Sequence, residues 1–281
     1  MIEAKACKEC CLDQIRRLGE LLNTDPGPIR AAFEKAFNAN LLRTAPEYAE
    51  LIFAEFEKQT GIKDPYKNIK DYSNSEAQRL EPVIHKILET KMDGLRYFIE
   101  LAIIGNMIDY GAFADVEIEH FIHHAIQSPY FKFDFEEFEK DLASSKTILY
   151  IADNSGEIIF DAKLLKHLHD AGKKTYLAVR GGPIINDITK EDAVLAGVDK
   201  FATIISTNNK IPGIIMGRVS KEFKDLYYNV DMVISKGQGN FETLYTGNNK
   251  RDKLYYLFVI KCRPVAELLD AQVTDKVLMR A

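Results

Sequence analysis

The chain has 281 residues, of which 46% are hydrophobic, so it can bury a substantial core and is long enough for one large or two ordinary domains. Its formal net charge of -5 argues against a general nucleic-acid surface, because such surfaces need clustered Lys and Arg. No apolar run is long enough to span a membrane, and the charged segment 1–25 lacks the apolar core of a signal peptide, so we expect a soluble, cytoplasmic protein.

Residues 1–145 carry the pattern of successive helices. Apolar residues recur at intervals of three and four in segments 51–62 and 95–113, as they do on the buried face of a helix. Prolines in segments 25–28 and 64–65 separate the helices, because proline suits a first helical turn and breaks an interior one. We therefore predict a helical N-terminal domain over residues 1–145.

After residue 145 the pattern changes to short β-rich runs that alternate with helices. The runs are nearly continuous in apolar residues, as in strands that are buried on both faces of a sheet. A helical segment at 156–172 ends in Gly172, which resembles a helix C-cap. This alternation predicts an α/β fold over residues 146–281, with a mostly parallel, doubly wound sheet. The predicted strands cover residues 147–153, 173–182, 201–209, 230–237 and 254–262.

The first predicted strand ends in an acid and an amide, which raises the question of function. Asp153 and Asn154 follow the apolar run, and a turn at Gly156 leads into the helix. Asn, Ser and Gly make a tight turn without a preceding acid, so the turn explains Gly156 but not Asp153. An acid at the carboxyl end of a central strand lies where open α/β sheets bind their ligands.

Two further motifs follow predicted strands of the same sheet. Asn186 and Asp187 lie after the second strand, and Lys236 ends the fourth strand just before Gly237 and Gly239. Neighbouring strands lie about 4.8 Å apart, so the loops at their carboxyl ends can meet over one crevice. We therefore expect the three motifs to form one site.

The residue types in these motifs suit a hard cation and a phosphate. The oxygens of Asp153, Asn154 and Asp187 are of the kind that Mg²⁺ or Mn²⁺ prefers. Lys236 would supply positive charge to a phosphoryl oxygen, and the two glycines after it would let backbone N–H groups approach the same anion.

Each motif also has a purely structural interpretation. Asp-Asn-x-Gly makes a good turn and helix N-cap, and the pair Asn186-Asp187 can cap the helix that follows it. Two glycines and a lysine after a strand are harder to explain as an ordinary turn. Because all three motifs stand at strand ends, we favour a functional site, although none matches a Walker loop or a dinucleotide fingerprint.

Cysteines and histidines offer a second kind of metal site, which we consider the weaker interpretation. Cys7 and Cys10 share a helical face, but no second such pair completes a tetrahedral site, so structural thiols are favoured over a metal or redox role. His120, His123 and His124 have a spacing that could clamp zinc, yet the same sequence is equally a polar helical face.

The helical segment 95–113 contains two polar residues that are costly in an apolar core. Asn106 and Asp109 lie three residues apart on it, flanked by Gly105 and Gly111. Buried polar groups of this kind need a partner or a cleft. Two interpretations therefore stay open: Asn106 and Asp109 line the site, or they make capping or buried structural hydrogen bonds.

Five stretches together carry a family resemblance. In sequence they read GNMID, DNSGE, GGPIINDIT, SKGQGNFE and IKCRPVA, and they resemble the motifs of the metal-dependent damage-control phosphatases, formerly domain of unknown function 89. The resemblance implies a helical domain packed on a Rossmann-like α/β/α domain, and a phosphatase supported by manganese, magnesium, cobalt or nickel. It also implies that Asp153, Asn154 and Asp187 hold the metal and that Lys236 lies near the substrate phosphate.

From the residues and the resemblance we predict a metal-dependent phosphomonoesterase that acts on small phosphorylated metabolites, such as sugar phosphates or damaged or surplus phosphometabolites. We expect no nucleic-acid or membrane partner, and the sequence does not predict the oligomeric state. The predicted catalytic residues are Asp153, Lys236 and Glu157; the predicted substrate- or phosphate-binding residues are Asn106, Asp109, Gly182, Asn186, Gly237, Gly239 and Asn240; and the predicted metal ligands are Asp153, Asn154 and Asp187.

Two mechanisms stay open for this reaction. Asp153 is either a nucleophile that forms an aspartyl-phosphate, or solely a metal ligand with metal-activated water attacking. The D-x-D signature of aspartate-nucleophile phosphatases is absent because residue 155 is Ser, which favours water. Glu157, Asp161 and Glu242 are available as supporting or base groups, and the sequence does not rank them.

Two other functions would use the same fold or the same residues. A Rossmann-like methyltransferase would want a glycine-rich turn after the first strand, whereas segment 151–158 offers one glycine and an acid. A non-catalytic binder of a nucleotide or sugar phosphate would use the predicted site unchanged. Only a turnover assay separates that binder from an enzyme.

Overall fold

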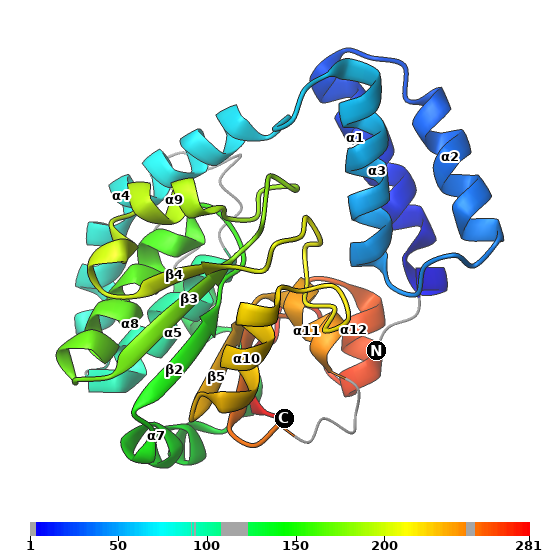
Figure 1. The fold of residues 1–281 in the computed structure, drawn as a ribbon. Coiled ribbons are helices and arrows are strands. Elements are labelled where there is room, and N and C mark those ends of the chain that lie inside the picture. The colour runs from blue at the N-terminus through cyan, green and yellow to red at the C-terminus, as the bar shows by residue number, and fades with distance from the viewer. Residues whose placement is uncertain (1–3, 91, 93, 108–122, 246–250) are drawn as a thin grey trace.

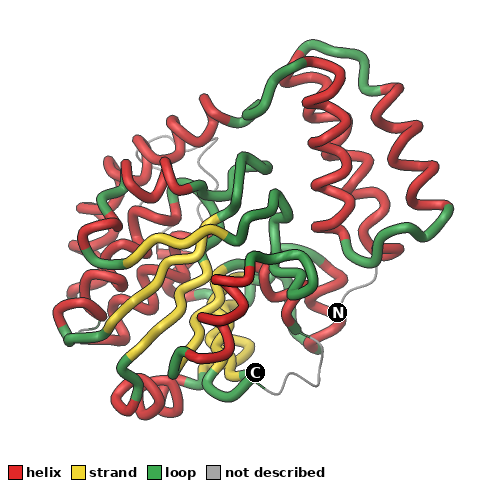
Figure 2. The backbone as a smooth tube through the Cα atoms, viewed as in Figure 1, coloured by secondary structure: helices red, strands yellow, loops and turns green. Residues whose placement is uncertain are grey.

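A seven-stranded β-sheet forms the centre of the molecule (Figures 1 and 2). The computed structural model describes residues 4–90, 92, 94–107, 123–245 and 251–281. The strands are β1 (Tyr130–Phe133), β2 (Thr147–Ile151), β3 (Lys174–Val179), β4 (Thr203–Ser206), β5 (Met232–Lys236), β6 (Leu254–Val259) and β7 (Lys276–Arg280). Their order in the sheet is β1-β7-β6-β5-β2-β3-β4. Strands β2 to β6 are parallel, β7 is antiparallel to β6, and β1 is parallel to β7, so the predicted α/β fold with a mostly parallel sheet is confirmed.

Helices cover both faces of this sheet (Figure 1). They are α1 (Lys8–Leu22), α2 (Gly27–Asn38), α3 (Ala45–Thr60), α4 (Lys67–Glu89), α5 (Gly94–Met107), α7 (Phe135–Ser144), α8 (Glu157–Asp170), α9 (Lys190–Leu195), α10 (Lys221–Asn229), α11 (Gln238–Leu244) and α12 (Arg263–Leu269). Helices α5, α7 and α8 share a hydrophobic core with one face, and α10, α11 and α12 share a second core with the other. Helix α4 packs outside α5 and α8. The strands are therefore buried on both faces, as their continuous apolar sequences require.

The first three helices form a separate bundle with its own core (Figure 1). Phe33 on α2 and Tyr48 and Phe56 on α3 are buried in it. Ile184 and Ile185, from the loop after β3, pack into the same core. The bundle thus contacts the sheet at the carboxyl ends of its parallel strands.

The five predicted strands are confirmed, and each ends before its predicted carboxyl end. The last residues leave the sheet because they form the loops that carry the motifs. Helix α8 confirms the predicted helix at 156–172, and Gly172 follows it with a φ of 73°. No helix within the described ranges is long and apolar enough to cross a membrane.

Two further strands were not expected from the sequence. Segment 130–133 was predicted to be helical and is strand β1, so that prediction is wrong there. β1 lies at the sheet edge and is only partly buried, so it lacks the continuous apolar run of a central strand. β7 was not recognised in the sequence because it begins and ends with a charged residue, Lys276 and Arg280. In the structure the Lys276 ammonium is buried against Glu100. The division into domains at residue 145 stays a prediction.

Candidate active site

The loops after β2 and β3 are joined at the carboxyl end of the sheet. Asn154 and Asp187 form an isolated antiparallel bridge, and the Ile188 N–H donates to the Asp153 carbonyl at 3.0 Å. Thr189 caps helix α9 through a capping box, so the cap does not use Asp187. The acids of the first two motifs therefore lie together and remain available for a ligand.

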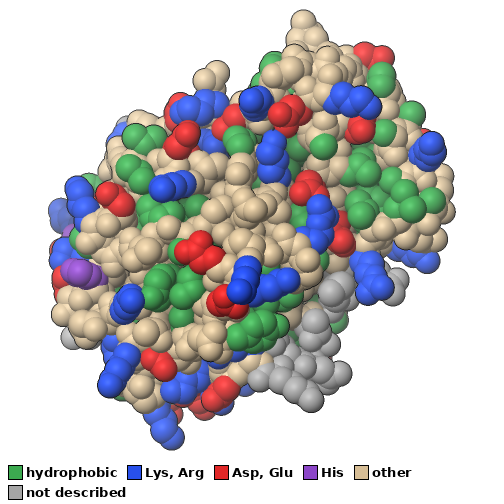
Figure 3. Space-filling view, in the orientation of Figure 1, with side chains coloured by type: hydrophobic (Ala, Val, Ile, Leu, Met, Phe, Trp, Pro, Cys, Tyr) green, Lys and Arg blue, Asp and Glu red, His purple; other side chains and the backbone are tan. Residues whose placement is uncertain are grey.

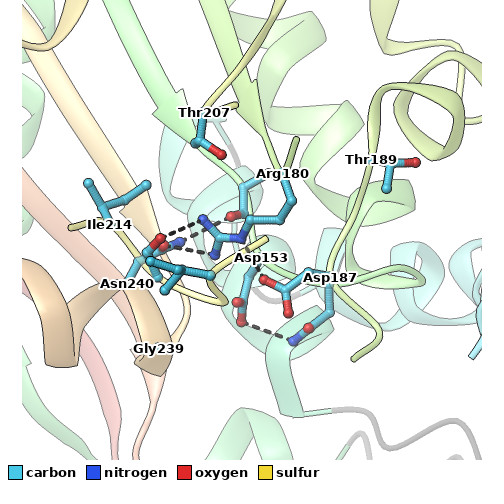
Figure 4. Close-up of polar contacts among 12 residues, drawn as sticks. Asp153, Arg180, Asp187, Thr189, Thr207, Ile214, Gly239 and Asn240 are labelled. Atoms are coloured by element: carbon cyan, nitrogen blue, oxygen red, sulfur yellow. Dashed lines mark hydrogen bonds and ion pairs between the residues drawn. The ribbon is translucent and has the colours of Figure 1, made fainter. Parts of the chain in front are cut away.

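Three oxygen atoms at this junction have the chemistry of a site for a hard cation. Asp153 Oδ2 accepts hydrogen bonds from Nδ2 of Asn106 at 3.3 Å and from Nδ2 of Asn154 at 3.0 Å. Asp187 Oδ2 accepts from Arg180 Nε at 2.6 Å (Figure 4). The Oδ1 atoms of Asp153, Asn154 and Asp187 have no hydrogen-bond partner among the described residues. Carboxylate and amide oxygens are the ligands that Mg²⁺ and Mn²⁺ prefer, so these residues fit a divalent metal.

The candidate set contains two carboxylates and one amide. In the described part of the chain no group of three or more His, Cys, Asp and Glu side chains is arranged to hold a metal ion. A magnesium-like ion usually takes only one or two carboxylates from the protein and completes its shell with water and substrate oxygens. The small number of acidic ligands therefore suits a cation that also binds a phosphate.

The electrostatics of the junction show a shortage of positive charge. Burial, together with the charges of the nearby Glu157 and Asp187, raises the pKa of Asp153 to about 8. Burial also raises the pKa of Asp187, although Arg180 opposes this rise. Carboxylates that resist ionisation in this way are stabilised by a bound cation.

Lys236 is fully buried in the interior of the protein. Its Nζ has no exposed surface and bonds to Glu157 Oε2 at 3.1 Å and to Asp161 Oδ1 at 2.8 Å. Burial alone would lower the pKa of Lys236, but Asp161 and Glu157 raise it above its usual range. The phosphate contact expected of Lys236 stays a prediction, and the contacts seen direct its ammonium to two carboxylates.

The glycines of the third motif allow a close approach to Asp153. Gly237 has a φ of 82°, and a Cβ atom there would lie 1.9 Å from Asp153 Oδ2. A Cβ atom at Gly239 would lie 2.4 Å from the Pro212 carbonyl oxygen. The Gly237 N–H is used in the sheet, where it donates to Leu257 O at 3.0 Å. Close backbone packing is therefore the physical reason for both glycines.

Arg180 directly follows β3 and connects all three motifs. The sequence analysis did not identify it as a site residue. It is 3% exposed, and besides its bond to Asp187 it donates to Asn240 Oδ1 at 2.9 Å and to Gly213 O at 3.3 Å (Figure 4). Asn240 Nδ2 in turn donates to Ala152 O at 3.0 Å. The available signal was a basic residue that ends an apolar strand directly before two glycines.

A pocket of about 520 Å³ opens above the ligand loops. The candidate ligands Asp153, Asn154 and Asp187 line it, together with residues of helix α1 and of the start of α12. Two cations line it, Arg17 and Lys261, and the sequence analysis singled out neither. Lys261 lies in the quoted IKCRPVA stretch, which was the one signal for it. Asn186, Gly239, Glu242, Cys7, Cys10 and Cys262 also line the pocket.

The remaining predicted residues have mixed positions. Asn106 lies in the ligand cluster, whereas Asn240 is buried beside Arg180. A Cβ at Gly182 would meet Lys210 Cε at 3.0 Å, so Gly182 packs beside that side chain. Asp109 lies outside the described residues. His120 also lies outside the described residues, and His123 and His124 are exposed. Cys7 and Cys10 are free thiols, and burial raises the pKa of each.

Comparison with known proteins decides the family. A family model described as the damage-control phosphatase ARMT1-like domain matches residues 4–277. The chain belongs to the damage-control phosphatase family. It is 35% identical over 285 residues to a damage-control phosphatase of Pyrococcus horikoshii, covering 98% of this chain and 96% of that protein. A damage-control phosphatase of Archaeoglobus fulgidus is 32% identical over 281 residues, covering 96% of each chain.

A solved structure of a damage-control phosphatase relative has the same fold. The crystal structure of a family protein from Pyrococcus horikoshii, classified under domain of unknown function 89, matches with a TM-score of 0.87 and 31% identity. The match covers 100% of this chain and 99% of that chain. The family resemblance drawn from the five sequence stretches is thereby confirmed.

Proposed function

We propose that this damage-control phosphatase is a metal-dependent phosphomonoesterase that hydrolyses small phosphorylated metabolites. Family membership and the two relatives named damage-control phosphatases support a phosphatase. The observation that supports metal dependence is the set of three side-chain oxygens of Asp153, Asn154 and Asp187 that have no hydrogen-bond partner among the described residues. They lie at the strand ends where parallel sheets bind ligands. A divalent cation held there would neutralise charge on the phosphoryl group and orient it.

Glu157 has a supporting role in this proposal, because it fixes the direction of two amides. Its Oε1 accepts from Nδ2 of Asn106 at 2.7 Å and from Nδ2 of Asn154 at 2.9 Å. An amide has one donating end and one accepting end, so this contact leaves the oxygen of Asn154 for the metal. Lys236 holds the other oxygen of Glu157 and keeps the carboxylate ionised.

Lys261 is the residue that we propose for the substrate phosphate. It lines the same pocket as Asp153, and its charge opposes the rise that burial causes in the pKa of Asp153. Lys236, by contrast, has no exposed surface. A mobile ammonium beside the metal ligands can bind phosphoryl oxygens that the cation leaves free.

Hydrolysis requires a water oxygen to bond to phosphorus while the ester P–O bond breaks, with a proton passing to the leaving alcohol oxygen. We propose water rather than Asp153 as the nucleophile, because the Asp153 carboxylate is fixed by two amide donors and by the close backbone of Gly237. Glu242 lines the pocket, and burial raises its pKa, which suits a group that donates the proton to the leaving oxygen.

Metal removal tests this function. After dialysis against a chelator, we expect no phosphate release from a panel of sugar phosphates, and Mn²⁺, Mg²⁺, Co²⁺ or Ni²⁺ should restore it. Asp187→Asn should lower the restored kcat/KM by roughly 10² or more, since it removes a charged ligand. Asp199→Asn, which changes an exposed acid away from the pocket, is the control. Full activity in chelator contradicts metal dependence, and no release with any metal contradicts the phosphatase.

The alternatives are weaker on the same observations. The loop after β2 presents an acid and an amide where a methyltransferase would need bare backbone, so that function is not favoured. A non-catalytic binder would show metal and phosphate binding without turnover in the same assay.

Basic and acidic side chains are interspersed on the face shown in Figure 3. The absence of nucleic-acid and membrane partners and the cytoplasmic location stay predictions.

A further inference from the structure

Helix α1 contributes several side chains to the pocket, among them Cys11 and Asp13. Cys10, Gln14 and Arg17 line it, and their spacing places them on one side of the helix. A helix rises 1.5 Å per residue, so Arg17 lies about 10 Å along the axis from Cys10. This face therefore runs along the pocket instead of touching it at one point.

The two ends of this face have different surroundings. At one end, burial and then the nearby Cys262 raise the pKa of Cys10, and Cys262 directly follows Lys261 in the chain. At the other end, Arg17 opposes the rise that burial causes in the pKa of Tyr66. Arg17 also acts on Cys10, which lies two helical turns away on α1, while Lys261 lies beside Cys262 in the chain.

Arg17 differs from its neighbour Arg16 in having no anionic partner within the described part of the chain. Arg16 bonds to Glu20 at 2.8 Å and to Asp13 at 3.5 Å on its own helix. Arg17 is exposed to the pocket and makes no hydrogen bond or ion pair among the residues that the structure describes. Its guanidinium is therefore available to a ligand, and a guanidinium pairs well with a carboxylate or a phosphate.

We propose that Arg17 binds a second anionic group of the substrate, so that the preferred substrates are small metabolites with a carboxylate or a second phosphate on the order of 10 Å from the scissile phosphate. The inference rests on the proposed phosphatase function, which places the scissile phosphate at the Lys261 end. A pocket of about 520 Å³ is large enough for a six-carbon phosphate ester. Specificity would then be set by the helical bundle, while the sheet supplies the reaction.

A matched pair of substrates tests the proposal. Sorbitol 6-phosphate and 6-phosphogluconate share one open carbon chain and differ only at the far end, which is an alcohol in one and a carboxylate in the other. Sorbitol 1,6-bisphosphate carries a phosphate at that end. With Mn²⁺ present, we expect the wild-type kcat/KM to be about tenfold or more higher for the two doubly anionic esters, because one charged pair is worth about that factor.

Substitutions on α1 assign the preference to one side chain. Arg17→Ala should lower kcat/KM for the doubly anionic esters by about tenfold and leave sorbitol 6-phosphate unchanged, and Arg17→Lys should retain part of the preference. Arg16→Ala, one position away and outside the pocket lining, should change neither. Equal wild-type rates on all three esters, or an equal loss on all three in Arg17→Ala, would overturn the proposal.

Binding separates this inference from the proposed function. The same three esters are titrated calorimetrically into the Mn²⁺-loaded protein. If no ester is hydrolysed, the phosphatase proposal fails, yet a preference for 6-phosphogluconate that Arg17→Ala abolishes still supports the second anion site. If the wild-type protein binds all three esters with equal affinity, the second anion site is wrong whether or not phosphate is released.

Discussion

Arg180 shows how a single buried residue can fix the orientation of a proposed metal ligand, Asp187. It takes one oxygen of Asp187 and leaves the other free, and it also holds Asn240 and the Gly213 carbonyl. A neutral group in its place would leave Asp187 to rotate and to lose its ionised form. We therefore expect Arg180 to affect metal binding through the Asp187 carboxylate.

Arg180→Met should lower the affinity for Mn²⁺ by about tenfold or more, as other losses of supporting contacts around metal sites do. Arg180→Lys should recover part of it, because a lysine keeps the charge but not the fork of donors. Arg218→Met, which removes an exposed ion pair with Glu50, is the control. Calorimetry on folded protein checks the prediction, and wild-type Mn²⁺ affinity in Arg180→Met contradicts it.

The two lysines of the site are expected to respond differently to substitution. Lys261→Ala should leave Mn²⁺ affinity nearly unchanged and lower kcat/KM by roughly 10², because it removes a contact to the phosphoryl group. Lys236→Met should lower the free energy of unfolding by about 3 to 5 kcal/mol, since it leaves Glu157 and Asp161 buried without their counter-charge.

Phosphatase kinetics, Mn²⁺ titration and urea unfolding on both lysine variants check this pair of expectations. Suppose that Lys236→Met unfolds like the wild-type protein and loses only kcat/KM. The phosphate role predicted for Lys236 from the sequence would then be right, and the assignment to Lys261 would be wrong.

At the scale of elements, the turn between β5 and α11 shapes the site through its backbone. Gly237→Ala combines a positive φ with a Cβ that would collide with Asp153 Oδ2. Gly172→Ala also has a positive φ, of 73°, but nothing lies within 4 Å of the added Cβ. The second variant therefore measures the cost of φ alone, which is about 1 to 2 kcal/mol.

We expect Gly237→Ala to lose Mn²⁺ binding and phosphatase activity together, because Asp153 must move. Gly172→Ala should keep both, with a small loss in the free energy of unfolding. Metal titration and urea unfolding on the two variants make the comparison. Normal Mn²⁺ binding in a folded Gly237→Ala protein would show that the close approach has no role in the site.

The elements that could be predicted are those whose sequence shows their burial directly. β2, β3 and β5 are continuous apolar runs, and the acids in the loops after β2 and β3 marked the candidate metal ligands Asp153 and Asp187. β7 could not be predicted in this way, because its Lys276 is buried against partners far away in the chain, Glu100 and the Ile126 carbonyl. Lone strands with charged ends resemble surface segments until their partners are known.

The contacts that sequence could not show are those between elements. Glu157 and Asp161 stand one turn apart on α8, but only the packing of α8 on the sheet brings both to Lys236. Arg17 likewise resembles any exposed arginine on an amphipathic helix. Its position over the ligand loops depends on how the bundle of α1, α2 and α3 docks.

For the whole molecule, the raised pKa of Asp153 links stability to pH. The folded protein keeps a proton on this carboxyl up to about pH 8, whereas the ordinary pKa is 3.8. Because the folded state then binds more protons than the unfolded state, the free energy of unfolding of the metal-free protein falls as pH rises between these values. A divalent cation favours the ionised form, so it should stabilise the protein more at pH 8 than at pH 6.

Asp153→Asn should flatten this dependence, because its side chain does not titrate. Melting temperatures of both proteins at pH 6 and pH 8, with and without Mn²⁺, check the prediction. The difference between the two proteins is the relevant quantity, since other groups titrate in both. If the wild-type protein and Asp153→Asn show the same pH dependence without metal, Asp153 has no raised pKa in the folded state.

The strand order has a consequence for how the chain is made. β7 is the last strand in the sequence, yet it lies between β6 and β1 inside the sheet. During synthesis β1 therefore leaves the ribosome long before its only neighbour, and β6 keeps an open edge until Lys276–Arg280 emerges. A chain cut or stalled before β7 would carry two unpaired strand edges, so we expect it to aggregate or be degraded instead of persisting as a partly active enzyme.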